Sequence, residues 1–131
     1  MRVEDKYLDV LQNIEWAIVN EFRKDASLLD LDVRDALDSL VRLYEAKPAS
    51  RSSAARRLSG PAERVFESAQ TVCEWRLGHS TESPPFAQVN PTPRSAAELV
   101  LCLKRIRKSL DRWTKHGGRQ GYLKFVADYI S

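Results

Sequence analysis

The sequence predicts an all-α protein, a single-domain bundle of about five amphipathic helices. Apolar residues recur along most of the chain at the three- and four-residue spacing of a helix face. No segment alternates apolar and polar residues as a half-buried strand does. The 131 residues are 43% hydrophobic and 30% charged, a balance typical of a globular domain with its own core. We therefore expect residues 1–131 to form one domain.

The first two predicted helices span residues 3–25 and 31–47. Asp30 is well placed to cap the second, whose acidic first turn suits the positive end of the helix dipole, and Pro48 ends it. At about 100° per residue, the apolar residues of each segment fall on one side. They are Val3, Tyr7, Val10, Leu11, Ile14, Ala17, Ile18 and Phe22 in the first, and Val33, Leu37, Leu40 and Tyr44 in the second.

The third predicted helix spans residues 61–79, after a basic, serine-rich connector at 48–60. Pro61 suits a first helical position, and Gly78 is a plausible stop. The apolar side of this helix consists of Ala62, Val65, Phe66, Ala69, Val72, Cys73 and Leu77.

Residues 80–94 hold four of the six prolines, so they are not expected to form a regular helix. This segment, if extended, reaches at most about 50 Å, whereas a helix of about 20 residues is roughly 30 Å long. We therefore expect a proline-rich crossover connector, long enough to make the third and fourth helices parallel; the sequence leaves both the parallel and the antiparallel arrangement open.

The fourth predicted helix spans residues 95–116. Ser95 and Glu98 form a capping-box pattern at its start. Gly117 and Gly118 supply a left-handed stop, and a short fifth helix is expected at 119–130, which is stable only when docked on the others. The apolar seam of the fourth helix consists of Leu99, Leu103, Ile106, Leu110 and Trp113.

No residue pattern points to a catalytic, cofactor-binding or metal-binding site, so we expect a protein that is not an enzyme. Cys73 and Cys102 fall at apolar helix positions, where free thiols behave as small hydrophobes. The two histidines are not spaced to share a metal ion. No apolar run reaches the roughly 18 residues of a membrane span, and the start lacks the order of a signal peptide. These features predict a cytoplasmic protein that does not bind membranes.

Charge is distributed unevenly along the chain. Residues 1–47 carry 7 Lys or Arg and 11 Asp or Glu, while residues 48–131 carry 14 and 7, within a net charge of +3. Such asymmetry fits two interpretations: an acidic face meeting a basic face in a homo-oligomer, or a basic face meeting an anionic partner.

Two sets of residues are candidates for a binding surface. Trp16 and Trp75 lie off the apolar stripes of their helices, and tryptophan is common in interaction hot spots. The leading hypothesis is therefore a non-enzymatic interaction protein that self-associates or binds a protein partner through them. The alternative is a nucleic-acid-binding protein that uses one face of the fourth helix, where cations span an arc of about 100° around Leu101. These cations are Lys104, Arg105, Lys108, Arg112 and Lys115.

Overall fold

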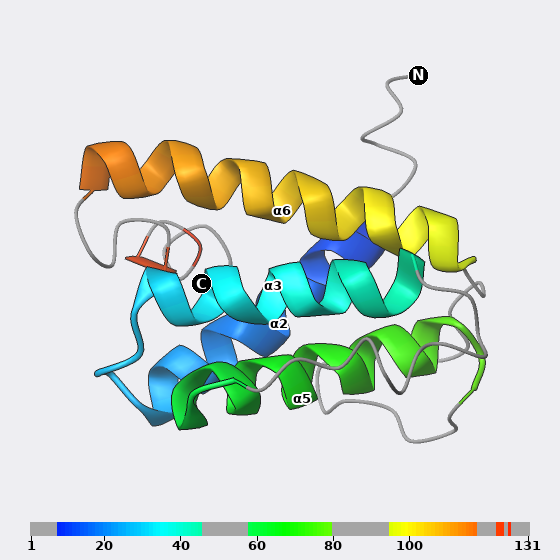
Figure 1. Cartoon of the computed structure of the whole chain (residues 1–131), viewed down its shortest axis with the longest axis horizontal. Helices are drawn as coiled ribbons and strands as arrows, with labels where there is room; N and C mark the ends of the chain where they lie inside the picture. The colour runs from blue at the N-terminus through cyan, green and yellow to red at the C-terminus, as the bar shows by residue number, and fades with distance from the viewer. Residues whose placement is uncertain (1–7, 46–57, 80–94, 118–122, 125, 127–131) are drawn as a thin grey trace.

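The computed structural model describes residues 8–45, 58–79, 95–117, 123–124 and 126. Within them the chain forms four longer helices and no strand (Figure 1). The helices are α2 (Leu8–Lys24), α3 (Asp30–Glu45), α5 (Gly60–Arg76) and α6 (Ala96–Gly117). The prediction of an all-α bundle is confirmed, and each of the first four expected helices has a counterpart. The fifth, at 119–130, falls mostly outside the described residues and stays a prediction.

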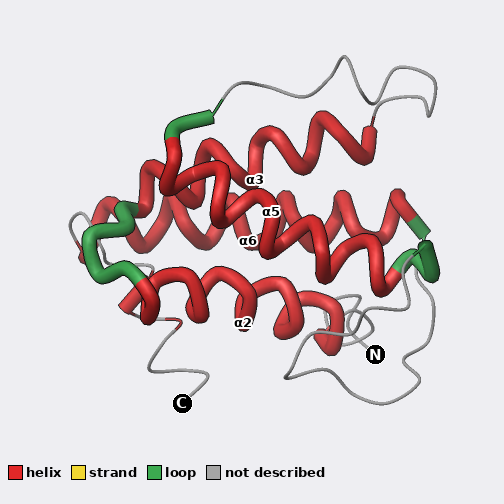
Figure 2. The backbone as a smooth tube through the Cα atoms, turned by 90° about the horizontal axis from the view of Figure 1, so that it is seen from below, coloured by secondary structure: helices red, strands yellow, loops and turns green. Residues whose placement is uncertain are grey.

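The four helices pack as a diamond, with α5 and α6 at opposite corners. Both α2 and α3 pack against α5, and both also pack against α6. Figure 1 shows α6 along one edge, α5 along the opposite edge, and α3 between them. Figure 2, turned by 90°, shows α2 and α3 on opposite sides of the other two helices. The outer faces of α5 and α6 therefore point away from each other.

The helix directions correct the expected crossover. In Figure 1, α3 and α5 run in the same direction, while α6 runs the opposite way. Consequently α5 ends near the end of the bundle where α6 begins, and the two are antiparallel. The sequence left the parallel and antiparallel arrangements open, because the length of a proline-rich connector permits a crossing without requiring one, and the structure has the antiparallel arrangement. Residues 80–94 themselves lie outside the described part of the chain. In contrast, α3 ends at the end of the bundle opposite the one where α5 begins (Figure 1).

Local hydrogen bonds define both ends of α5. At the start, the Ser59 hydroxyl accepts the Ala62 N–H at 3.4 Å, and Pro61 occupies the first turn. At the end, Gly78 adopts a φ of +81°, which a glycine tolerates without strain. The His79 N–H then donates to the Glu74 carbonyl at 3.0 Å, and the Gly78 N–H to the Trp75 carbonyl at 3.1 Å. This is a Schellman motif, and the expected stop at Gly78 is confirmed.

The predicted capping box of α6 is also present. The Ser95 N–H donates to Glu98 Oε1 at 3.1 Å, while the Glu98 N–H donates to Ser95 Oγ at 3.2 Å. The two residues thus satisfy each other's backbone donors at the first turn.

The start of α3 differs from the expectation that Asp30 caps it. The Leu29 carbonyl accepts the first helical bond, from the Asp32 N–H at 3.0 Å, and Asp32 Oδ2 accepts the Leu29 N–H at 3.0 Å. The Asp30 side chain instead turns inward, where Oδ1 accepts the Leu123 N–H at 3.4 Å. The residue that caps α3 is therefore Leu29, one position before the expected Asp30, because the Asp30 carboxylate is used in a tertiary contact.

The predicted apolar faces meet in one core. All the residues expected on the apolar side of α3 are buried, as are the four leucine and isoleucine positions of the α6 seam. Cys73 and Cys102 are free and buried, as expected. Among the helices described, none is both long and apolar enough to cross a membrane. The core comprises Val10, Ile14, Ala17, Ile18, Val33, Leu37, Leu40, Val65, Ala69, Val72, Leu99, Leu103, Ile106, Leu110, Leu123 and Val126, among others.

Candidate functional site

The outer side of α6 presents a row of exposed cations, which we call the basic face: Lys104, Arg105, Lys108 and Arg112. These residues point outward because the buried seam of the same helix packs against α2 and α3. Lys115 belongs to the same row by its helix position, but its side chain lies outside the described residues. The structure thus brings four of the five predicted cations together on one accessible surface.

Two of these cations make no ion pair with the described residues. Lys104 Nζ lies 2.6 Å from Glu45 Oε1 of α3, with both side chains about half exposed. Lys108 and Arg112 make no ion pair with the part of the chain that the structure describes. Both side chains are exposed, so an anion in solution can reach them.

Arg107 lies at the edge of the basic face, on the side of α6 that packs toward α3. Its Nε lies 2.9 Å from Asp38 Oδ1, and its Nη1 contacts Asp111 Oδ1. Partial burial lowers the pKa of Arg107, but the hydrogen bonds to Asp111 and Asp38 outweigh this effect and raise it above its usual value. This cation is held in the seam between α3 and α6 and does not contribute to the basic face.

Leu101 lies in the middle of the basic arc and is 54% exposed. Scattered exposed leucines are common on protein surfaces. A leucine surrounded by cations, however, adds apolar area to a surface that otherwise attracts anions.

The two tryptophans have different surroundings. Trp75 is only 8% exposed, so the structure leaves little of it for a partner, and the Arg76 guanidinium lies 5.6 Å from its ring centroid. Trp16 is half-buried, and the Arg23 guanidinium lies 5.6 Å from its ring. Of the aromatic pair predicted as a partner interface, Trp16 is the accessible member.

A buried polar cluster near the end of α5 was not predicted from the sequence. Arg76 is 1% exposed, and its Nη2 lies 2.6 Å from Asp9 Oδ2 of α2. The signal was present in the sequence: Arg76 follows Ala69 by seven residues and Val72 by four, so it lies on the apolar side of α5. In the same region the Tyr44 hydroxyl donates to Glu74 Oε2 at 2.9 Å. This cluster connects α2, α3 and α5, and its cation is buried away from any substrate.

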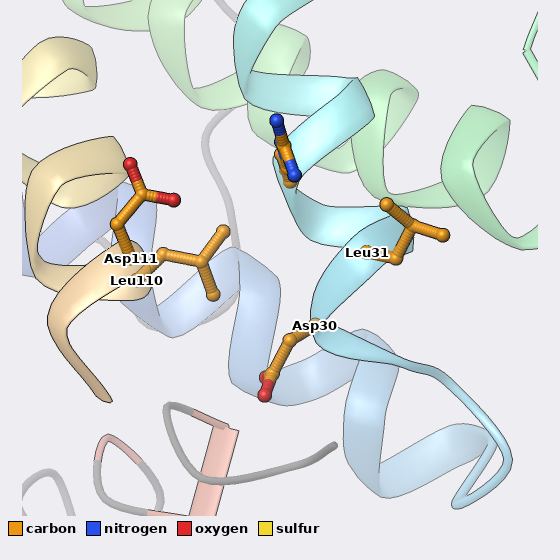
Figure 3. A pocket seen from close by; sticks show the side chains of 5 residues that line it. Asp30, Leu31, Leu110 and Asp111 are labelled. Atoms are coloured by element: carbon orange, nitrogen blue, oxygen red, sulfur yellow. The ribbon is translucent and has the colours of Figure 1, made fainter. Parts of the chain in front are cut away.

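A shallow pocket lies between the start of α3 and the later part of α6. It is lined by Asp30, Leu31, Arg34, Leu110 and Asp111 and has a volume of about 90 Å³ (Figure 3). Pockets for small-molecule ligands are typically larger than about 300 Å³. This pocket is therefore too small to enclose a substrate or cofactor.

The described residues contain no group of three or more His, Cys, Asp or Glu side chains placed to hold a metal ion. Burial, with smaller contributions from Glu74 and Cys102, raises the pKa of the Cys73 thiol, which makes it a poor nucleophile. No protein-family model, curated protein or solved structure matches the chain. The basic face is the strongest candidate for a functional site.

Proposed function

We propose that this chain is a non-enzymatic binding protein whose basic face on α6 binds the phosphate backbone of a nucleic acid. The observation that carries the proposal is the exposed row of Lys104, Arg105, Lys108 and Arg112, in which Lys108 and Arg112 make no ion pair with the described residues. Cations arranged in this way neutralise phosphates and release the counterions condensed on a nucleic acid. The contact is to the backbone, so little dependence on base sequence is expected.

Salt-dependent binding of a labelled, random-sequence DNA duplex tests the proposal. Each neutralised phosphate contributes about −0.9 to the slope of log K against log salt, so four cations predict a slope on the order of −3 to −4. A slope near zero, or no binding at low salt, would contradict it. Fluorescence anisotropy over a series of salt concentrations measures this slope.

Two matched charge reversals distinguish the basic face from the net charge of the protein. Lys108→Glu changes the charge within the basic face, while Lys24→Glu makes the same change at an exposed site on α2. The first variant should weaken DNA binding at least tenfold and the second less than twofold, with helicity by circular dichroism unchanged in both. Equal weakening would show that the α6 face is not the binding surface.

A second candidate function is contact with another protein, a further copy included, through Trp16. It is supported by the half-buried ring of Trp16 and the Arg23 guanidinium above it, because both residue types are enriched in interface hot spots. Trp16→Ala should then shift the oligomeric state measured by light scattering after size exclusion. Leu31→Ala, at a leucine that is 56% exposed elsewhere, is the control and should have no effect. A strict monomer at high protein concentration would remove the homo-oligomer form of this candidate.

A further inference from the structure

The outer side of α5 carries a negatively charged counterpart to the basic face. Glu63, Glu67 and Glu74 fall within an arc of about 40°, opposite the buried residues of the same helix, and we call them the acidic face. Glu63 and Glu67 are exposed and make no ion pair with the described residues. Glu74 is half-buried, accepts the Tyr44 hydroxyl and lies 3.6 Å from His79 Nδ1.

The two faces cannot meet within one molecule. The helices α5 and α6 occupy opposite corners of the bundle (Figure 1). The acidic and basic faces lie on the sides of these helices opposite their buried residues, so they point in opposite directions. Each molecule therefore presents one surface of each sign, facing outward.

The charges on the two helices have the same spacing. Glu63, Glu67 and Glu74 are separated by four and seven residues, as are Lys104, Lys108 and Lys115. Four residues correspond to about 6 Å along a helix and seven to about 10 Å. Two such helices lying side by side and parallel, from different molecules, place each glutamate level with a lysine.

We propose that the basic face of one copy docks on the acidic face of a second copy. The contact is heterologous, since it joins two different surfaces, and each added copy leaves one face of each sign free. Contacts of this type form rings or open chains and do not stop at a dimer. Exposed ion pairs are individually weak and are screened by salt, so the association is expected at low ionic strength and high protein concentration.

This inference shares the basic face with the proposed function, but it does not depend on nucleic-acid binding. A DNA duplex and a second copy would compete for the same cations. Adding duplex DNA should therefore reduce the self-association.

Sedimentation velocity of nucleic-acid-free protein at low ionic strength tests the proposal. The weight-average mass should rise with concentration to at least twice that of the monomer. It should return to the monomer value near 1 M salt, where the Debye length is about 3 Å. A monomer at every concentration in low salt would overturn the proposal.

Charge-swapped variants show which surfaces are in contact. A double variant, Glu63→Lys with Glu67→Lys, should be monomeric, and so should Lys104→Glu with Lys108→Glu. An equimolar mixture of the two should associate again, because the acidic α5 of one meets the basic α6 of the other. A mixture that stays monomeric while both variants keep wild-type helicity would overturn the proposal.

The same variants separate this inference from the proposed function. The α5 double variant should lose self-association and retain DNA binding, while the α6 double variant should lose both. Loss of DNA binding in the α6 variant alone, with self-association absent in the wild type, would support the proposed function and overturn the inference.

Discussion

Arg76 and Asp9 form an ion pair that ties the end of α5 to the start of α2, with 2.6 Å between Nη2 and Oδ2. The two partners differ in environment, since the Arg76 side chain is 1% exposed and that of Asp9 36%. A second contact joins Arg76 Nη1 to Asn13 Oδ1 at 3.4 Å. A permanently charged guanidinium is thus buried in the bundle, in contact with a carboxylate and an amide oxygen of α2.

Asp9→Ala should destabilise the protein by about 2 to 3 kcal/mol, because it leaves the Arg76 charge buried without its carboxylate. This loss of stability is smaller than the loss expected for breaking a fully buried ion pair, because Asp9 itself is partly exposed. Urea denaturation followed by circular dichroism measures the change. The double variant Asp9→Leu with Arg76→Met removes both charges and should lose less stability than Asp9→Ala; a larger loss would show that the pair stabilises the fold by itself.

Ser95→Ala should cost about 1 kcal/mol in the free energy of unfolding, because the Glu98 N–H loses its side-chain acceptor at the first turn of α6. Ser109→Ala, at a half-buried position inside the same helix, is the matched control. Alanine is the better helix former there, so this variant should be neutral or slightly stabilising. Equal effects of the two substitutions in urea titrations would argue against the capping role of Ser95.

Ser39→Ala should leave stability unchanged or raise it by about 1 kcal/mol. The Ser39 hydroxyl is buried and has no hydrogen-bond partner among the described residues, and burying an unpaired hydroxyl is unfavourable. The thermal midpoint by differential scanning calorimetry measures the change. A loss of more than about 1 kcal/mol would indicate that the hydroxyl is paired in solution.

The buried Cys73 thiol should make stability fall at alkaline pH. Burial raises its pKa above the ordinary value of 9.0, so the folded protein keeps a proton that the unfolded chain releases above that pH. The free energy of unfolding should therefore be constant below pH 9 with respect to this group and decrease by up to about 1.4 kcal/mol per pH unit above it.

Cys73→Ala isolates this contribution, because other groups also titrate in alkaline solution. The difference in unfolding free energy between wild type and variant should shrink as pH rises from about 9 to 10.5. A difference independent of pH in this range would show that the Cys73 thiol ionises as readily in the folded protein as in the unfolded chain.

The sequence predicted the basic face of α6 but not the acidic face of α5. The cations of α6 were found because all five fall within an arc of about 100° on the side of the helix opposite its apolar seam. The acidic face was missed, although the spacing of Glu63, Glu67 and Glu74 places them on one side of α5. The acidic face can serve as a docking surface for a second copy because α5 lies at the corner opposite α6. The sequence pattern of a single helix does not predict that arrangement.

The sequence by itself determined the positions of the four described helices and several of their ends, because capping and turn formation depend on residues within a few positions of each other. The Ser95–Glu98 box and the stop at Gly78 are examples, and the apolar stripes likewise follow from local spacing. Only the tertiary structure decided the antiparallel arrangement of α5 and α6, the burial of Trp75, and the inward turn of Asp30. These features depend on which helices become neighbours, which is set by packing between residues far apart in the chain and not by the pattern along any single segment.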